Sequence, residues 1–104
     1  MRVVVLSPDL VDRSHISAVL PDAELVSVAA QLPAAAEGAD VVVVDVSRPG
    51  VLDVLAQVVA SAGDVVAFGP HVDTAALAAA TAAGARAMPR SRFFVDIAAA
   101  VVPQ

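Results

Sequence analysis

Four short polar segments each follow a run of apolar residues, and they carry the side chains best suited to chemistry. They are Ser7-Pro8-Asp9, Asp45-Val46-Ser47-Arg48, Gly69-Pro70-His71 and Pro89-Arg90-Ser91-Arg92. Carboxylates in such places can hold a divalent cation, and arginines can pair with phosphate or carboxylate. An unperturbed histidine titrates near physiological pH. If these segments come together in space, they form one candidate site.

Several kinds of chemistry are disfavoured by the residues that accompany these segments. Ser7, Asp45 and His71 have the residue types of a hydrolase triad, but Pro8 removes the backbone N–H that would serve an oxyanion hole. The chain has no cysteine and only two histidines, which excludes thiolate chemistry and disfavours a multi-histidine metal site. No glycine-rich loop follows the first apolar run, so neither flavin nor NAD is expected.

The composition is that of one globular domain spanning residues 1–104. Of the 104 residues 59% are apolar, mostly the 24 alanines and 22 valines, and such a chain can bury a core. Aromatic residues are 3% and the net charge is −5, which argues against a nucleic-acid partner. The strand-like apolar runs are far shorter than the roughly 20 residues of a membrane span, and the start lacks a signal peptide pattern. We therefore expect a cytoplasmic protein with no membrane contact.

Short β-branched runs alternate with longer segments rich in alanine and leucine. Five runs predict strands, at Val3–Leu6, Leu25–Val28, Val41–Val44, Val65–Phe68 and Ala85–Met88. Continuous apolar runs are typical of a sheet that is covered on both faces. Between them, helical spacing predicts the buried faces Ile16, Val19, Leu20; Val51, Val54, Leu55, Val58, Val59; Leu77; and Phe94, Ile97, Ala98, Val101.

The ends of these elements are marked by glycines and by capping residues. Gly38, Gly63 and Gly84 each stand where a helix should end in a left-handed cap, and Asp9, Asp73 and Thr74 are candidate N-caps. Five βα units predict a doubly wound α/β fold with a five-stranded parallel sheet in the flavodoxin-like order 2-1-3-4-5. That order places a crevice at the carboxyl ends of strands 1 and 3.

The segment from Asp40 to Gly50, DVVVVDVSRPG, resembles the third strand and following loop of the receiver domains of two-component response regulators. Gly84-Ala85 before the fifth strand and Phe93 after it are also receiver-like. The resemblance covers essentially the whole chain in length and element order. It implies that Asp45 stands at the position of the phosphoacceptor, with a pocket formed by Ser7, Asp9, Gly69, His71, Arg90 and Ser91.

The chain departs from the receiver pattern at three of the four parts that support phosphoryl transfer. Ser7 and Pro8 replace two adjacent acidic residues that hold Mg²⁺, which leaves Asp9 and Asp45 as a weak metal site at most. Gly69 replaces a threonine or serine. Arg90 or Ser91 falls near the position of a lysine, and a planar guanidinium does not reproduce a compact ammonium charge.

These departures predict a stand-alone, degenerate receiver-like domain of bacterial signal transduction, which is not an enzyme and acts by protein–protein contact. The expected contact face comprises the helix around Leu77, the strand Ala85–Met88 and the helix that follows, and it suits a protein partner or a homodimer. Two alternatives remain: a working phosphorelay regulator that uses Asp45 with Mg²⁺, and a sensor that holds a small anion near Asp45, His71 and Arg90.

Each candidate residue also has a simpler interpretation as a structural residue. Asp45 can cap the loop that follows its strand, and Asp9 can cap the first helix. His71 can be an ordinary surface residue. The arginines of the last third of the chain can be solvated cations that balance eleven acidic residues.

Overall fold

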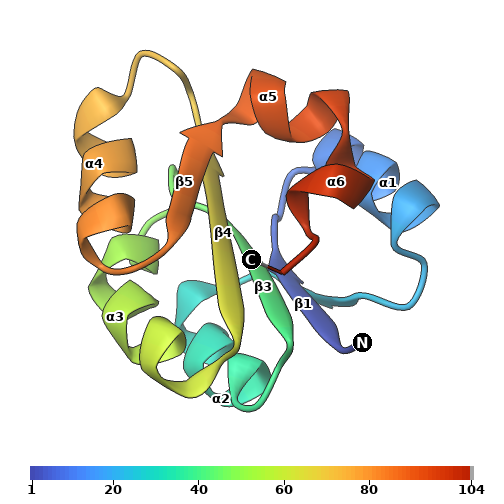
Figure 1. Ribbon diagram of the computed structural model, residues 1–104, viewed down its shortest axis with the longest axis horizontal. Coiled ribbons are helices and arrows are strands. Elements are labelled where there is room, and N and C mark those ends of the chain that lie inside the picture. Colours follow the sequence, from blue (N-terminus) through green and yellow to red (C-terminus); the bar gives the residue numbers. More distant parts are fainter. Residues whose placement is uncertain (104) are drawn as a thin grey trace.

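The computed structural model describes residues 1–103, and their five strands form one parallel sheet in the order β2-β1-β3-β4-β5 (Figure 1). The strands are β1 (Val3–Leu6), β2 (Glu24–Val26), β3 (Val41–Asp45), β4 (Asp64–Gly69) and β5 (Arg86–Pro89). Every neighbouring pair runs parallel. The predicted fold class and strand order are therefore confirmed, and the architecture is flavodoxin-like.

Helices cover both faces of the sheet (Figure 1). Short helices η1 (Ala29–Gln31) and α2 (Leu32–Ala36) lie with α3 (Val51–Ser61) and α4 (Thr74–Ala82) on one face. The other face carries α1 (Leu10–Val19), α5 (Arg90–Val95) and α6 (Ile97–Ala100). Within residues 1–103 no helix has both the length and the apolar character to cross a membrane.

The central strand β3 supplies side chains to two separate cores. Val42 and Val44 pack towards α3, where Leu55 is fully buried. Val41 and Val43 pack on the opposite face towards Phe93 of α5. All four valines have no exposed surface. This confirms the prediction that Val41–Val44 is central and buried. A strand that is covered on both faces consists of apolar residues without polar ones between them.

The predicted bounds of the third, fourth and fifth strands differ from the structure by one residue at one or both ends, and two other predicted elements differ more. The second strand ends at Val26, and Val28 is 53% exposed where it precedes η1. The last helix is interrupted at Asp96, whose backbone leaves the helical region and whose side chain accepts a hydrogen bond from the Ala99 N–H at 3.1 Å. The prediction of one continuous final helix with Ala98 on its buried face was wrong, because Asp96 starts a new helix there and leaves Ala98 exposed.

Gly63 serves a purpose different from the predicted left-handed cap. Gly38 and Gly84 have positive φ as expected, but Gly63 does not. A Cβ atom on Gly63 would lie 2.5 Å from the backbone oxygen of Asp40. The glycine is therefore required for the close approach of two chain segments rather than for its conformation.

Candidate functional site

The register of the sheet places Ser7, Asp45 and Phe68 side by side at the carboxyl edge. Asp45 pairs with Phe68, and Leu6 pairs with Val44 one position earlier. Ser7 follows Leu6 directly, so it lies next to Asp45, just beyond the end of β1. Side chains alternate between faces along a strand, and all three therefore lie on the face covered by α1, α5 and α6.

Asp45 is 1% exposed, and its carboxylate is held by the loop that follows β3. Its Oδ1 accepts hydrogen bonds from the Ser47 N–H at 3.0 Å and from the Ser47 hydroxyl at 2.6 Å. Its Oδ2 accepts one from the Nε of Arg48 at 3.3 Å. An aspartate that bonds to the backbone two residues later shapes a turn, so Asp45 fixes the start of the loop towards α3.

Arg90 reaches across the same edge of the sheet to Asp12 of α1. Its Nη2 donates to Oδ1 of Asp12 at 2.6 Å, and its guanidinium lies 5.2 Å from the centre of the Phe94 ring and 5.9 Å from that of Phe68. The hydrogen bond to Asp12 raises the pKa of Arg90, desolvation opposes this, and the charges of Asp12, Asp45 and Asp9 add to the rise. Arg90 thus serves as the fixed cation of this acidic edge.

Two buried polar atoms at this edge lack a hydrogen-bond partner within residues 1–103. They are the hydroxyl of Ser7, a residue with no exposed surface, and Oδ2 of Asp12, a residue that is 3% exposed. A buried polar atom without a partner is costly and uncommon. Arg90 therefore offsets the buried charge of Asp12 through one carboxylate oxygen alone.

Asp12 was missed by the sequence interpretation, although the sequence contains a signal for it. It precedes Ile16 by four positions, and residues four apart share one face of a helix. Because Ile16 is fully buried against the sheet, Asp12 points the same way. An acidic residue within the apolar stripe of a helix needs a partner, and Arg90 is that partner.

Asp9 is exposed and caps α1, as its simpler interpretation predicted. Its Oδ1 accepts a hydrogen bond from the Asp12 N–H at 3.0 Å. This bond is the main cause of the lowered pKa of Asp9; desolvation opposes it, and the Val11 N–H, Arg48 and Arg90 lower the pKa further. The carboxylates of Asp9 and Asp45 are thus each occupied by different donors of the chain.

The donor set at this edge does not suit Mg²⁺. No group of three histidine, cysteine, aspartate or glutamate side chains that could hold a metal ion occurs within residues 1–103. Both oxygens of Asp45 already accept hydrogen bonds, and Arg90 places a positive charge beside Asp12. Mg²⁺ requires near-octahedral oxygen ligands, which these residues do not supply.

Gly69, His71 and Ser91, the other predicted pocket residues, differ in their surroundings. Gly69 is buried at the end of β4, where an added Cβ atom would lie 2.9 Å from Cγ2 of Val46. His71 is exposed in the loop between β4 and α4, and Ser91 is exposed on α5. The carboxylates whose charges act on Arg90 are those of Asp12, Asp45 and Asp9.

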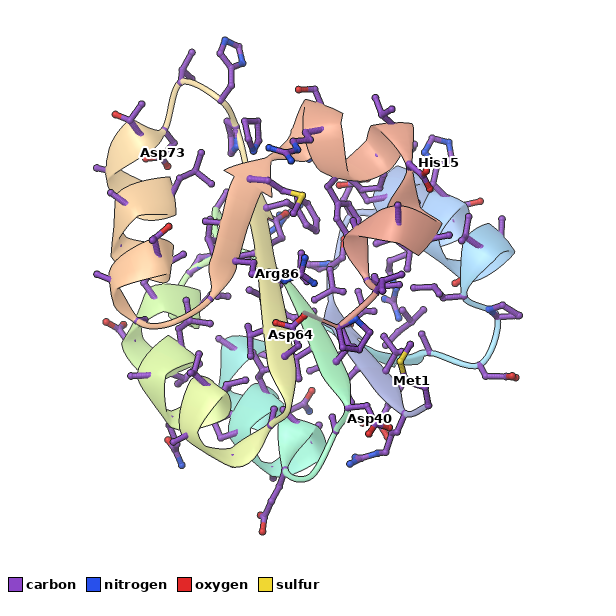
Figure 2. All side chains as sticks on the ribbon, viewed as in Figure 1. Met1, His15, Asp40, Asp64, Asp73 and Arg86 are labelled. Carbon is purple, nitrogen blue, oxygen red and sulfur yellow. The ribbon has the colours of Figure 1, made fainter. Side chains whose placement is uncertain are left out.

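Arg86, by contrast, is a structural residue and not a solvated cation. Its Nε and Nη2 bind the carboxylate of Asp64, with the shortest contact at 2.5 Å, and Nη2 also donates to the carbonyl oxygens of Ala100 and Val102. Figure 2 shows Arg86 and Asp64 together between β5 and α6. The guanidinium thereby fastens the end of α6 to the sheet, since a helix C-terminus favours a cation.

The capping of α1 by Asp9 predicts how the stability of the fold depends on pH. The pKa of Asp9 is lower in the folded state than its ordinary value of 3.8. The charged cap therefore stabilises the fold above that value, and this contribution disappears as the pH falls through the folded pKa. In urea unfolding, Asp9→Asn should be less stable than the wild type at about pH 7, and the difference should shrink below about pH 4. A difference that stays constant over this range would show that the carboxylate charge is irrelevant.

No model of a known protein family matches this chain, and no curated protein matches it. The sheet order is shared by proteins of many functions, so fold alone does not assign one. The likeness to receiver domains therefore depends on the residues around Asp45 and on the order of the elements. The chemistry of the edge itself must carry any functional conclusion.

Proposed function

We propose that this chain is a receiver-like domain that acts by contact with a protein partner in signal transduction and takes up no phosphoryl group on Asp45. The observation that carries the proposal is the state of Asp45, which is buried with both carboxylate oxygens engaged by Ser47 and Arg48. The domain would thus keep one fixed conformation at this edge.

Phosphoryl transfer to a carboxylate needs an accessible oxygen in line with the phosphorus atom and cations that neutralise the transferred group. Asp45 has no free, accessible oxygen in this arrangement. Arg90, the nearest counterpart of the receiver lysine, is bound to Asp12. Gly69 brings no hydroxyl, and a larger residue there would force Val46 to shift, because an added Cβ atom would lie 2.9 Å from its Cγ2. These features together favour a domain without phosphoryl transfer.

The face formed by α4, β5 and α5 is the proposed contact surface. β5 is an edge strand, and each of its four residues is only half-buried. The adjoining α4 exposes small side chains, among them Ala75, Ala78 and Ala79. Small side chains permit close approach of a partner element, and an open strand edge offers backbone hydrogen-bonding groups.

Phosphorylation can be tested directly. Incubation with acetyl phosphate and Mg²⁺, followed by intact-protein mass spectrometry, should give no adduct, while an active receiver domain in the same experiment gives one. Beryllofluoride with Mg²⁺ should likewise leave the NMR signals of Ser47 and Arg48 unchanged. An adduct that disappears in Asp45→Asn would overturn the proposal in favour of a working phosphorelay regulator.

The interaction part of the proposal has its own test. Affinity capture with the wild type and with Asp45→Asn should retain the same proteins, because the charge of Asp45 serves only the loop. Ala78→Glu, which adds a charge on the exposed side of α4, should lose them while the domain melts normally. Retention by Ala78→Glu combined with loss by Asp45→Asn would place the contact at the carboxyl edge instead.

A further inference from the structure

A cavity of about 310 Å³ lies between β5, α5 and α6, beside the break in the last helix at Asp96. Its apolar lining includes Met88, which is half-buried on β5, and Ala99 and Ala100 of α6. Val95, the last residue of α5, also lines the cavity and is 85% exposed. Small-molecule sites in proteins have volumes of roughly 300–1,000 Å³, so the ligand that fits this cavity is small.

Two of the charges at the cavity cancel each other. Arg86 lines the cavity, and its Nε and Nη2 bind the carboxylate of Asp64 (Figure 2). Nη2 also donates to the carbonyl oxygens of Ala100 and Val102. Arg86 and Asp64 therefore form a fixed and neutral pair, and the recognition of a charged ligand depends on other residues of the lining.

Arg92 and Asp96 supply one uncompensated charge of each sign. Both residues line the cavity, both are exposed, and neither has an ion-pair partner within residues 1–103. Asp96 accepts the hydrogen bond from the Ala99 N–H with Oδ1, so its Oδ2 is available to a ligand. An anion would be attracted by Arg92 and repelled by Asp96, and a cation would meet the reverse. Only a ligand that carries both charges is stabilised by both residues.

We propose that this cavity binds an apolar α-amino acid in its zwitterionic form. Arg92 pairs with the α-carboxylate, which matches the parallel N–H donors of a guanidinium, and Asp96 accepts a hydrogen bond from the α-ammonium group. The aliphatic side chain of the ligand packs on Met88 and Ala99 and covers Val95, which removes apolar surface from water. All three groups of the ligand branch from one carbon atom, so a small cavity can contact them together. This inference goes beyond the proposed function, which involves no small molecule.

L-Leucine is the probe for this site. In NMR titrations up to about 50 mM, the amide signals of Met88, Val95 and Ala99 should shift and saturate with a dissociation constant of about 0.1–10 mM, because exposed ion pairs contribute little affinity. Three analogues each lack one of the recognised groups. Isoamylamine lacks the carboxylate, N-acetyl-L-leucine lacks the ammonium group, and L-serine lacks the aliphatic side chain. Each analogue should bind about tenfold more weakly or not at all.

Two variants remove the recognising charges one at a time. Arg92→Gln and Asp96→Asn should each weaken the binding of L-leucine about 5- to 10-fold. The melting temperature should stay nearly unchanged, because Arg92 is exposed and asparagine is also a good N-cap for α6. Asp22→Asn is the matched control. It removes an exposed carboxylate that lines a different cavity, and this variant should bind L-leucine as the wild type does.

Three results would overturn the inference. The first is the absence of saturable shifts with L-leucine up to about 50 mM. The second is an equal affinity for N-acetyl-L-leucine, which would show that the cavity recognises an apolar anion and not a zwitterion. The third is an unchanged affinity in both charge variants, which would place the bound L-leucine elsewhere. None of these results affects the test with acetyl phosphate, which decides the proposed function independently.

Discussion

Val43→Asp is expected to abolish the folded state. Val43 has no exposed surface and lies on the central strand between Val5 and Val66, in contact with the core under α5. A carboxylate there has no cation or hydrogen-bond donor in reach of a wholly apolar cluster. Burial of an unpaired charge costs more than the roughly 5–15 kcal/mol by which domains of this kind are stable. Circular dichroism should show no cooperative melting.

Two matched variants serve as controls for the effect of Val43→Asp on stability. Val43→Ala removes two methyl groups and should lower the free energy of unfolding by about 2–3 kcal/mol, which leaves a folded domain with a lower melting temperature. Val72→Asp introduces the same carboxylate at a residue that is 75% exposed and should change the stability little. If Val43→Asp melted cooperatively near the wild-type temperature, β3 would not be the central strand.

The strands could be predicted from the sequence because a strand that is buried on both faces is a continuous run of apolar residues. The four consecutive valines at 41–44 show no alternation of apolar and polar residues. This pattern predicted both the strand and its position at the centre of the sheet. The second strand was harder to delimit, because an edge strand of three residues pairs on one side only and Ser27 and Val28 already belong to the following loop. Its apolar residues do not differ from those of a loop that packs on the core.

The break in the last helix could be foreseen only in part. Asp96 is a common capping residue, but its neighbours Phe94, Ile97 and Val101 keep helical spacing across the break. The spacing of apolar residues shows only which side chains are buried, and both short helices bury their apolar side chains on the same face of the sheet. The cap at Asp96 therefore interrupts the helix without changing the spacing of Phe94, Ile97 and Val101.

The strand order predicted the edge of the sheet at which Asp45 and Arg90 lie, but the contacts of these residues depend on pairs that are distant in sequence. The carboxyl edge of strands 1 and 3 follows from the strand order, and Asp45 and Arg90 were singled out there. The ion pair of Arg90 with Asp12 joins residues 78 positions apart. Nothing local in either segment selects that partner over Asp9 or Asp45, since all three carboxylates lie near the same guanidinium.

The second large effect is expected for Arg90→Met, which leaves Asp12 without its cation. The side chain of Asp12 is 5% exposed, its Oδ2 has no partner among residues 1–103, and Oδ1 would lose the bond from Arg90. Removing one partner of a buried ion pair costs about 3–5 kcal/mol. Because the side chain of Arg90 itself is 43% exposed, a loss of about 2–4 kcal/mol in the free energy of unfolding is expected.

Substitution of the other partner, Asp12, should lower the free energy of unfolding far less. The difference between the two losses is the decisive measurement. Asp12→Asn keeps the shape of the side chain and leaves a half-exposed guanidinium that remains hydrated and stacked on Phe94, so a loss of about 1 kcal/mol or less is expected. The double variant should be more stable than Arg90→Met alone, because no buried charge remains. Equal losses for the two single variants in urea unfolding would show that Arg90 stabilises the edge by packing on Phe68 and Phe94 rather than by its charge.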